Sequence, residues 1–259
     1  MPKYVILSFD DGRKDTYTNA VPIMLENNIP ATINITTAFL EYPDTCGLFP
    51  DVIERAMSIE NLLEIQDKGF EIANHGAYHK NTIEDIEEAN KKLKSWGIKI
   101  ENIGFASPYS YITDKNCNEL IKMINSRKIS YIRSGTQVRR EKIYYKVLWV
   151  LEKITRSSYL FYLLHRKSIF NIFKREIILK GITINNNTTF NQIKKIIERM
   201  PSNTYIILNF HSILSRNEQG YKDKWSWDKE KFIKLCEYLK NTKSIKIIKT
   251  IELVKELSK

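Results

Sequence analysis

Two adjacent aspartates and three histidines are the residues of this sequence whose types and spacing suit hydrolytic chemistry. Asp10 and Asp11 end the apolar run "KYVILSF" and are followed by glycine, in "SFDDG". His75 and His79 are spaced four residues apart after the run "FEIAN", and His211 closes the run "TYIILNF". Two imidazoles and one carboxylate are the ligands of many catalytic zinc sites, where a fourth position holds water.

The aspartate pair needs a turn in the chain if both carboxylates are to serve one pocket. Neighbouring side chains of a strand point to opposite faces. Gly12 directly follows the pair and permits a turn, because glycine tolerates positive φ. One carboxylate could then bind a cation while the other stays free beside it, and the cation would offset their mutual repulsion.

The histidine pair supplies the other two ligands. Spacing i, i+4 would place the imidazoles of His75 and His79 on one side of a helical turn, with Gly76 allowing a tight entry. A bound metal would lower the pKa of its water toward about 7, and the free carboxylate would take the proton. His211 is the remaining histidine at a strand end and is the candidate acid for the leaving group.

Each motif also has a plain structural explanation. Asp-Asp-Gly after a strand is often only a turn, and paired histidines are often surface residues. A histidine such as His211 in an apolar run is more often a hydrogen-bonded core residue. All three motifs follow predicted strands, in this order along the chain, and that combination favours a site.

The elements that must position these residues alternate between strands and helices along the whole chain. Strand-like runs cover 3–9, 31–39, 70–74, 102–108, 130–136, 176–184, 204–213 and 244–251, and amphipathic helical patterns cover 18–28, 58–69 and 82–97. This alternation predicts an α/β fold with a parallel sheet of about eight strands, for which a closed or nearly closed barrel is the favoured arrangement and an open sheet is the alternative. In such a barrel, chemistry belongs at the C-terminal ends of the strands.

Composition disfavours several other classes of protein. The net charge of +11 could attract nucleic acid, but the lysines are scattered through predicted helices, so we expect no nucleic-acid partner. Cys46, Cys117 and Cys236 are far apart and form no CxxC pair, which argues against a cysteine metal site or a disulfide framework. No signal peptide or membrane-spanning run is recognisable, so we expect a cytoplasmic protein.

We expect one catalytic domain over 1–259, with a helical insertion at about 139–175. The insertion is rich in aromatic residues and carries ten Lys or Arg against two Glu. Packing against the side of the barrel is the favoured explanation, and peripheral contact with an anionic membrane is the alternative. The sequence carries no sign of an oligomeric state.

Four motifs make the sequence similar to a known family. "SFDDG" (8–12), "NHGAYH" (74–79), "GFASPYS" (104–110) and "ILNFHSI" (207–213) resemble the first, second, third and fifth motifs of the polysaccharide deacetylases, carbohydrate esterase family 4, which share the NodB-homology domain. "IPATINI" (29–35) is also similar to the family's second strand. The resemblance spans nearly the whole chain and implies a deformed (β/α) barrel of about seven to eight parallel strands.

The resemblance implies a metal-dependent enzyme that removes acetyl groups from N-acetylated sugars of a polysaccharide or glycoconjugate. It also implies roles for individual residues: Asp10 as the base, Asp11, His75 and His79 as the metal ligands, His211 as the acid, and the backbone of Tyr109 as an oxyanion donor. Zn²⁺ is the first expectation for the metal, and Co²⁺, Ni²⁺ or Fe²⁺ would fit the same ligands.

The sequence also departs from the family pattern. Ala106 stands where the third motif commonly has an arginine that orients the catalytic aspartate, and Asn209 replaces a leucine of the fifth motif. "YIRSGTQ" (131–137) lacks the fourth-motif Asp and Trp, although its Arg133 could lie near the site. A catalytically impaired glycan-binding relative is therefore the alternative to an active enzyme.

Two tryptophans could contact the substrate. Trp225 and Trp227 follow His211 in "GYKDKWSWDKEKF" (220–232). Indole rings pack well on the C–H faces of sugars, so a glycan platform is one explanation. Capping of the next helix by Ser226 or Asp228, with a tryptophan packed at its start, is an equally weighted one.

Overall fold

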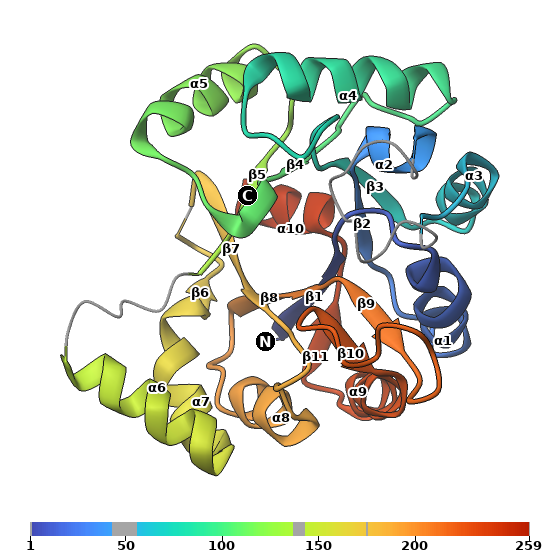
Figure 1. Cartoon of the computed structure of the whole chain (residues 1–259). Helices are drawn as coiled ribbons and strands as arrows, with labels where there is room; N and C mark the ends of the chain where they lie inside the picture. The colour runs from blue at the N-terminus through green and yellow to red at the C-terminus, as the bar shows by residue number, and fades with distance from the viewer. Residues whose placement is uncertain (1, 43–55, 137–142, 175, 259) are drawn as a thin grey trace.

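The computed structural model describes residues 2–42, 56–136, 143–174 and 176–258, and its centre is a closed parallel barrel. Figure 1 looks into the barrel, with helices around its outside. Seven strands pair in the order β1-β2-β3-β4-β5-β7-β8, and β8 pairs back onto β1. They are β1 (Lys3–Phe9), β2 (Thr32–Ile35), β3 (Glu71–Asn74), β4 (Phe105–Ala106), β5 (Ile132–Gly135), β7 (Ile178–Thr183) and β8 (Thr204–Phe210). The predicted deformed (β/α) barrel is confirmed.

The barrel is deformed because its strands differ in length. β1 and β8 pair continuously from Tyr4–Tyr205 to Phe9–Phe210, whereas β4 has only 2 residues. β11 (Ile245–Ile247) adds a parallel pair outside β1, and β6 (Phe170–Asn171) pairs antiparallel with β8. β9 (Ser212–Leu214) and β10 (Ser226–Asp228) form a separate parallel pair beyond β8.

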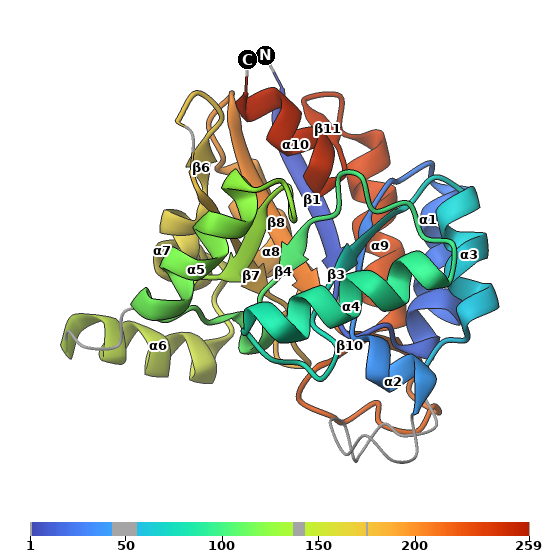
Figure 2. The same ribbon diagram turned by 90° about the horizontal axis from the view of Figure 1, so that it is seen from above.

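Helices follow most strands and cover the barrel. They are α1 (Val21–Glu26), α2 (Thr37–Glu41), α3 (Ile59–Asp67), α4 (Ile83–Ser95), α5 (Asp114–Asn125), α6 (Ile143–Thr155), α7 (Ser158–His165), α8 (Phe190–Glu198), α9 (Lys229–Asn241) and α10 (Thr250–Leu257). A π-helical turn, Thr16–Ala20, precedes α1, and short 3-10 turns η3 (Pro108–Ser110) and η4 (Arg166–Ser168) complete the set. In the side view of Figure 2, both chain termini lie at the end opposite the strands' C-terminal ends.

Local sequence signals explain the best predicted helices. Ser58 accepts a hydrogen bond from the backbone of Asn61 and caps α3, and Thr82 caps α4 in the same way. Gly69 and Gly97 follow the ends of these helices with φ of 88° and 90°, the left-handed conformation that suits a helix end. The helices predicted over 58–69 and 82–97 are thus confirmed.

Strand alternation divides the barrel interior into an apolar layer and a polar layer. Tyr4 and Ile6 of β1 pack in one cluster with residues of β3, β7 and β8, so they face the interior. By the same alternation, Ser8 and then Asp10 continue the inward face toward the C-terminal end. Ser8 and Asp10 therefore make the interior polar near that end.

Several predicted strands are longer than those observed. The run predicted over 31–39 stops at Ile35, and α2 begins at Thr37. The run over 204–213 is broken between β8 and β9 at His211, and the run over 244–251 ends at Ile247 before α10. In each case an apolar stretch continues past the strand because the following turn or helix is also buried.

The insertion predicted at about 139–175 contains a helical pair in its described part. α7 packs against α8, and α6 packs on α7 at the outside of the molecule (Figure 1). The assignment of 1–259 to one domain stays a prediction. Cys117 and Cys236 are free thiols, and Cys46 lies outside the described residues. Among the described helices, none combines the length and apolar character that a membrane span requires.

Candidate active site at the C-terminal end of the barrel

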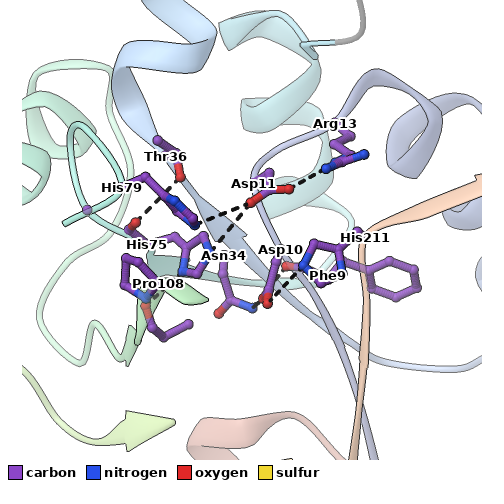
Figure 3. Close-up of polar contacts among 12 residues, drawn as sticks. Phe9, Asp10, Asp11, Arg13, Asn34, Thr36, His75, His79, Pro108 and His211 are labelled. Atoms are coloured by element: carbon purple, nitrogen blue, oxygen red, sulfur yellow. Dashed lines mark hydrogen bonds and ion pairs between the residues drawn. The ribbon is translucent and has the colours of Figure 1, made fainter. Parts of the chain in front are cut away.

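The predicted site residues come together at the C-terminal end of the barrel. Asp10 and Asp11 follow β1, His75 follows β3, and His211 follows β8. Figure 3 shows these side chains directed toward one another, with His79 beside His75. The exposed fractions of the two carboxylates and of His75 are 2% or less, so charge on these groups is shielded from bulk water.

A sharp turn aims the two aspartates at one pocket. Asp11 has φ of 78° and Gly12 has φ of 86°, so the strand ends with two consecutive residues in the left-handed region. A Cβ on Gly12 would lie 2.7 Å from Cδ1 of Leu40, so this position also lacks room for a side chain. The turn predicted from Gly12 is confirmed, and it extends back to Asp11.

Asp11, His75 and His79 have the geometry of a metal site. One ligand atom from each lies within 4.8 Å of the others. Oδ1 of Asp11 is 3.5 Å from Nε2 of His75 and 3.9 Å from Nε2 of His79. Tetrahedral zinc, with bond lengths of about 2.0 to 2.2 Å, would separate its ligand atoms by about 3.4 Å. The three residues therefore fit such an ion after a small contraction.

The surroundings of the two imidazoles also suit metal binding. Nδ1 of His75 lies 2.8 Å from the carbonyl oxygen of Ala106, so it donates there and leaves the lone pair of Nε2 facing Asp11. Burial lowers the pKa of His79 to about 4, which keeps this ring neutral near pH 7. Neutral imidazole is the form that binds metal.

The prediction that His75 and His79 lie on a helical turn is wrong. Residues 75–80 form a non-helical loop in which Gly76 has φ of 85° and His79 has φ of 57°. The Asp85 carboxylate holds this loop by accepting hydrogen bonds from the backbone N–H groups of Tyr78 and Lys80, at 2.8 and 2.9 Å. A buried acceptor, rather than helical periodicity, brings the two imidazoles together.

Arg13 orients the carboxylate of Asp11, and the sequence analysis missed it. Its Nε donates to Oδ2 of Asp11 at 2.9 Å, and its Nη1 donates to Ser212 at 3.0 Å. Burial raises the pKa of Asp11, but the Arg13 charge and the neighbouring histidines outweigh it and hold that pKa well below the usual value. Oδ2 is thus committed to Arg13, while Oδ1 faces the imidazoles (Figure 3).

Asp10 is held by two buried side chains from two other strands of the barrel. Asn34 of β2 donates to Oδ1 of Asp10 at 2.8 Å, and Nη2 of Arg133 of β5 makes a hydrogen-bonded ion pair with the same oxygen. Burial raises the pKa of Asp10, but Arg133 together with His75 and His211 reverses this, so the net shift is downward. Asp10 therefore stays ionised, with Oδ2 left to face the site.

Arg133 reaches Asp10 from the strand beside the one that carries Ala106. Ala106 of β4 and Arg133 of β5 are register partners in adjacent parallel strands, so their side chains project from the same face. The Arg133 side chain is 1% exposed and reaches Asp10 across the barrel interior. The sequence analysis noted Arg133 without assigning a role. Asn34, which was not singled out, was visible only as a polar residue inside an apolar strand.

His211 lies on the other side of Asp10 from the histidine pair. Its Nε2 is 3.9 Å from Oδ2 of Asp10, and its ring centroid is 5.1 Å from that of Trp225. Burial lowers the pKa of His211, more strongly than the two aspartates raise it. Within the described part of the chain its Nδ1 has no hydrogen-bond partner, although it is buried.

The two tryptophans have different environments. Trp225 is 38% exposed and borders His211, so its predicted role in substrate contact stays open. Trp227 is 1% exposed, donates to the carbonyl of Thr188 and packs against Phe210, so the substrate-binding prediction for Trp227 is wrong. The alternative, a tryptophan packed at a helix start, describes it: Asp228 caps α9 directly after it.

Tyr109 lies at the rim of the site. Its backbone is left-handed, with φ of 57°, and its ring centroid is 4.6 Å from that of His79. Its side chain is 77% exposed. The oxyanion role of its backbone N–H stays a prediction.

Comparison with known proteins supports the family resemblance. The family model described as polysaccharide deacetylase matches residues 1–124, and this confirms the resemblance over that part of the chain. The matched part includes Asp10, Asp11, His75, His79 and Tyr109, whereas His211 lies beyond it. A search of curated protein sequences gives no match.

Solved structures share the fold at low sequence identity. A family 4 acetyl xylan esterase from Clostridium thermocellum, in complex with a cobalt ion, is 14% identical over 97% of this chain and 90% of that one, with a TM-score of 0.52. A mutant of the peptidoglycan deacetylase PdaC from Bacillus subtilis is 11% identical over 99% and 92%, also with a TM-score of 0.52. The chain spans 56% of the Streptococcus pyogenes deacetylase PplD, a match that covers 51% of this chain at 16% identity with a TM-score of 0.41.

Proposed function

We propose that this protein is a divalent-metal-dependent hydrolase that removes acetyl groups from N-acetylated sugars of a polysaccharide or glycoconjugate. The observation that carries the proposal is the convergence of Asp11, His75 and His79 on one point, with Asp10 and His211 beside it. The family match over residues 1–124 supports deacetylation as the reaction.

The metal would be held by Asp11 and the two imidazoles. Zn²⁺ is the simplest choice for one carboxylate and two nitrogens, and Co²⁺, Ni²⁺ and Fe²⁺ suit the same ligands. When bound, it would polarise the acetyl carbonyl and acidify a water molecule. Arg13 would keep Asp11 in its ligating orientation, and Ala106 would keep His75 in its ligating tautomer.

Asp10 would act as the general base. Asn34 and Arg133 hold its Oδ1, which leaves Oδ2 to accept a proton from the attacking water. The low pKa of Asp10 keeps it ionised but makes it a weak base. It can therefore deprotonate only a water that has been acidified, which agrees with a metal-dependent reaction.

His211 would deliver a proton to the leaving nitrogen. Because burial lowers its pKa, His211 is neutral in the resting protein and must first gain a proton. The proton that Asp10 takes from water can reach Nε2 of His211 across the 3.9 Å separation and then the amine. Water and the amide thus become acetate and a free amino sugar. The Tyr109 backbone N–H would stabilise the oxyanion.

A glycan-binding protein with little turnover is the second candidate. Two observations favour it: Nδ1 of His211 is buried without a partner in the described structure, and the fourth-motif Asp is missing. An unoriented imidazole is a poorer acid, because a partner on Nδ1 normally fixes its tautomer and position.

Acetate release separates the two candidates. The purified chain, loaded with Zn²⁺ or Co²⁺, is incubated with oligomers of N-acetylglucosamine and with O-acetylated xylo-oligosaccharides. The proposal expects acetate from the first substrate, abolished in Asp10→Asn. Binding of the oligomers without acetate release favours the glycan-binding candidate, and release only from the O-acetylated substrate contradicts action on nitrogen.

A further inference from the structure

Helix α6 is apolar on two opposite faces, and within the described parts of the chain only one of them is covered by protein. Its inner face carries the half-buried side chains Tyr145, Leu148 and Trp149 and the buried Glu152. Glu152 accepts a hydrogen bond from Gln192 of α8 at 2.7 Å, and the helix packs on α7. This face fixes the helix to the barrel and accounts for its inner residues.

The outer face of α6 is a stripe of uncovered apolar side chains. At about 100° per residue, the six members fall within a sector of roughly 120°, opposite the inner face. Their exposed fractions are 79% for Ile143, 62% for Tyr144, 51% for Val147, 46% for Val150, 43% for Leu151 and 75% for Ile154. A contiguous patch of this kind marks an interaction surface rather than ordinary solvent-exposed helix.

The charge around the stripe identifies an anionic partner. Lys146 lies beside the N-terminal part of the stripe and Lys153 beside its C-terminal end. Both lysines are exposed and border the stripe on the same side. Residues 143–174 contain six Lys or Arg and one acid, Glu152, which is buried on the inner face. An apolar stripe bordered by lysines is the pattern of helices that lie in a membrane interface, where the lysines reach the phosphate level.

We propose that α6 is an interfacial anchor that docks this protein on an anionic lipid bilayer. Its 13 residues lie along the surface, with Ile143, Val147 and Ile154 in the acyl boundary. A second copy of the chain is the less favoured occupant, because antiparallel pairing of two such stripes would also bring their lysine borders close together, whereas anionic headgroups attract the lysines.

The position of α6 relates the bilayer to the site. Figure 2 shows α6 at the outer edge of the molecule, level with the C-terminal ends of the strands. A groove of about 600 Å³ runs from Tyr145 of α6 and Lys167 of η4 to Ser110 and Tyr111, directly beside Tyr109. If the proposed function holds, the docked enzyme would reach glycans that are attached to, or lie close to, that bilayer.

Flotation of the full chain with lipid vesicles tests the anchor. Vesicles of phosphatidylcholine alone and with about one-third phosphatidylserine are compared. We expect binding to the anionic vesicles, weakened by salt, and at least tenfold weaker binding for Val147→Asp/Ile154→Asp. Phe173→Asp is the matched control, because Phe173 is 78% exposed but lies outside α6, and it should leave binding unchanged.

A double variant that replaces both lysines by uncharged glutamine tests their contribution to binding. Lys146→Gln/Lys153→Gln should weaken binding to anionic vesicles by about fivefold per lysine, whereas Lys91→Gln/Lys94→Gln on α4 should have no comparable effect. Absence of vesicle binding by the unchanged chain, or equal binding by Val147→Asp/Ile154→Asp, overturns the proposal. So does a dimer that Val147→Asp/Ile154→Asp dissociates.

The anchor and the proposed function can fail separately. Vesicle binding is read without any turnover, and acetate release from soluble oligosaccharides is read without lipid. The variants of α6 should leave acetate release from soluble oligosaccharides unchanged, because none of the substituted residues belongs to the candidate active site.

Discussion

Arg133 is predicted to position Asp10 for catalysis, and replacing it tests this reasoning in depth. In Arg133→Met the buried chain is replaced by an apolar one of similar length, so the cavity stays filled while the charge is lost. Asp10 would keep its hydrogen bond from Asn34 and lose its only hydrogen-bonded cation among the described residues. The carboxylate would then be buried without compensation.

The magnitude follows from the burial of the pair. Two unit charges about 3 Å apart, at an effective dielectric of about 20, attract by about 5 kcal/mol, and burial of both groups opposes this. Removing one partner of a buried pair typically costs about 3–5 kcal/mol of stability. For catalysis, displacement of the base by about 1 Å costs on the order of 100-fold in rate. We therefore expect a loss of about 100-fold in kcat/KM.

The assay is acetate release as a function of pH, together with metal content. Burial raises the pKa of Asp10, and the charge of Arg133 opposes that effect. Without Arg133 the pKa of Asp10 therefore rises, and the acid limb of the pH profile moves to higher pH. Metal content should be unchanged, because the ligands are different residues. Arg133→Lys should retain part of the rate. The double variant Arg133→Ala/Ala106→Arg moves the arginine to the neighbouring strand and should be faster than Arg133→Ala. A rate within threefold of the unchanged enzyme, with the same acid limb, refutes the positioning role.

Three further predictions concern the site and the fold. Asp11→Ala should lose both metal and activity, whereas Asp10→Asn should keep the metal and lose most activity; equal metal loss in the two would show that their roles are exchanged. Burial raises the pKa of Asp15 to about 6, so its ionisation destabilises the fold. Relative to Asp15→Asn, the free energy of unfolding should fall by up to about 3 kcal/mol between pH 4 and 7, as urea titrations at each pH will show, and parallel curves would contradict it. Gly104→Ala would place a Cβ 1.9 Å from the Tyr131 ring and should destabilise by about 1–3 kcal/mol, whereas an unchanged melting temperature would show that the ring has room to move.

The fold was predictable because strand and helix periodicities agree with turn and cap signals along the chain. The run "KYVILSF" predicted β1 with the bounds that the structure has, and Ser58 and Thr82 marked two helix starts. The predicted strand boundaries were wrong where burial continues past a strand. Residues 37–40 are buried like those of β2, so composition alone could not end that strand at Ile35.

The residues of the candidate metal site could be predicted from the sequence, but the side chains that hold the neighbouring aspartate in place could not. Asp11, His75 and His79 carry an unusual combination of residue types, which is visible without coordinates. Arg133 is 123 residues away from Asp10 and meets it only because the barrel closes and both side chains enter its interior. Trp227 shows the opposite error, because an aromatic residue near a motif is indistinguishable in sequence from one that completes the core.

The most direct test of the account is metal binding by the purified chain itself. The protein is stripped with chelator, reloaded with Co²⁺ or Zn²⁺, dialysed and measured by elemental analysis, with the visible absorption of Co²⁺ as a second readout. We predict one tightly held ion per chain, lost in His79→Ala and retained in Asp10→Asn. A chain that retains no ion after reloading, or that retains it equally well without His79, would contradict the central claim.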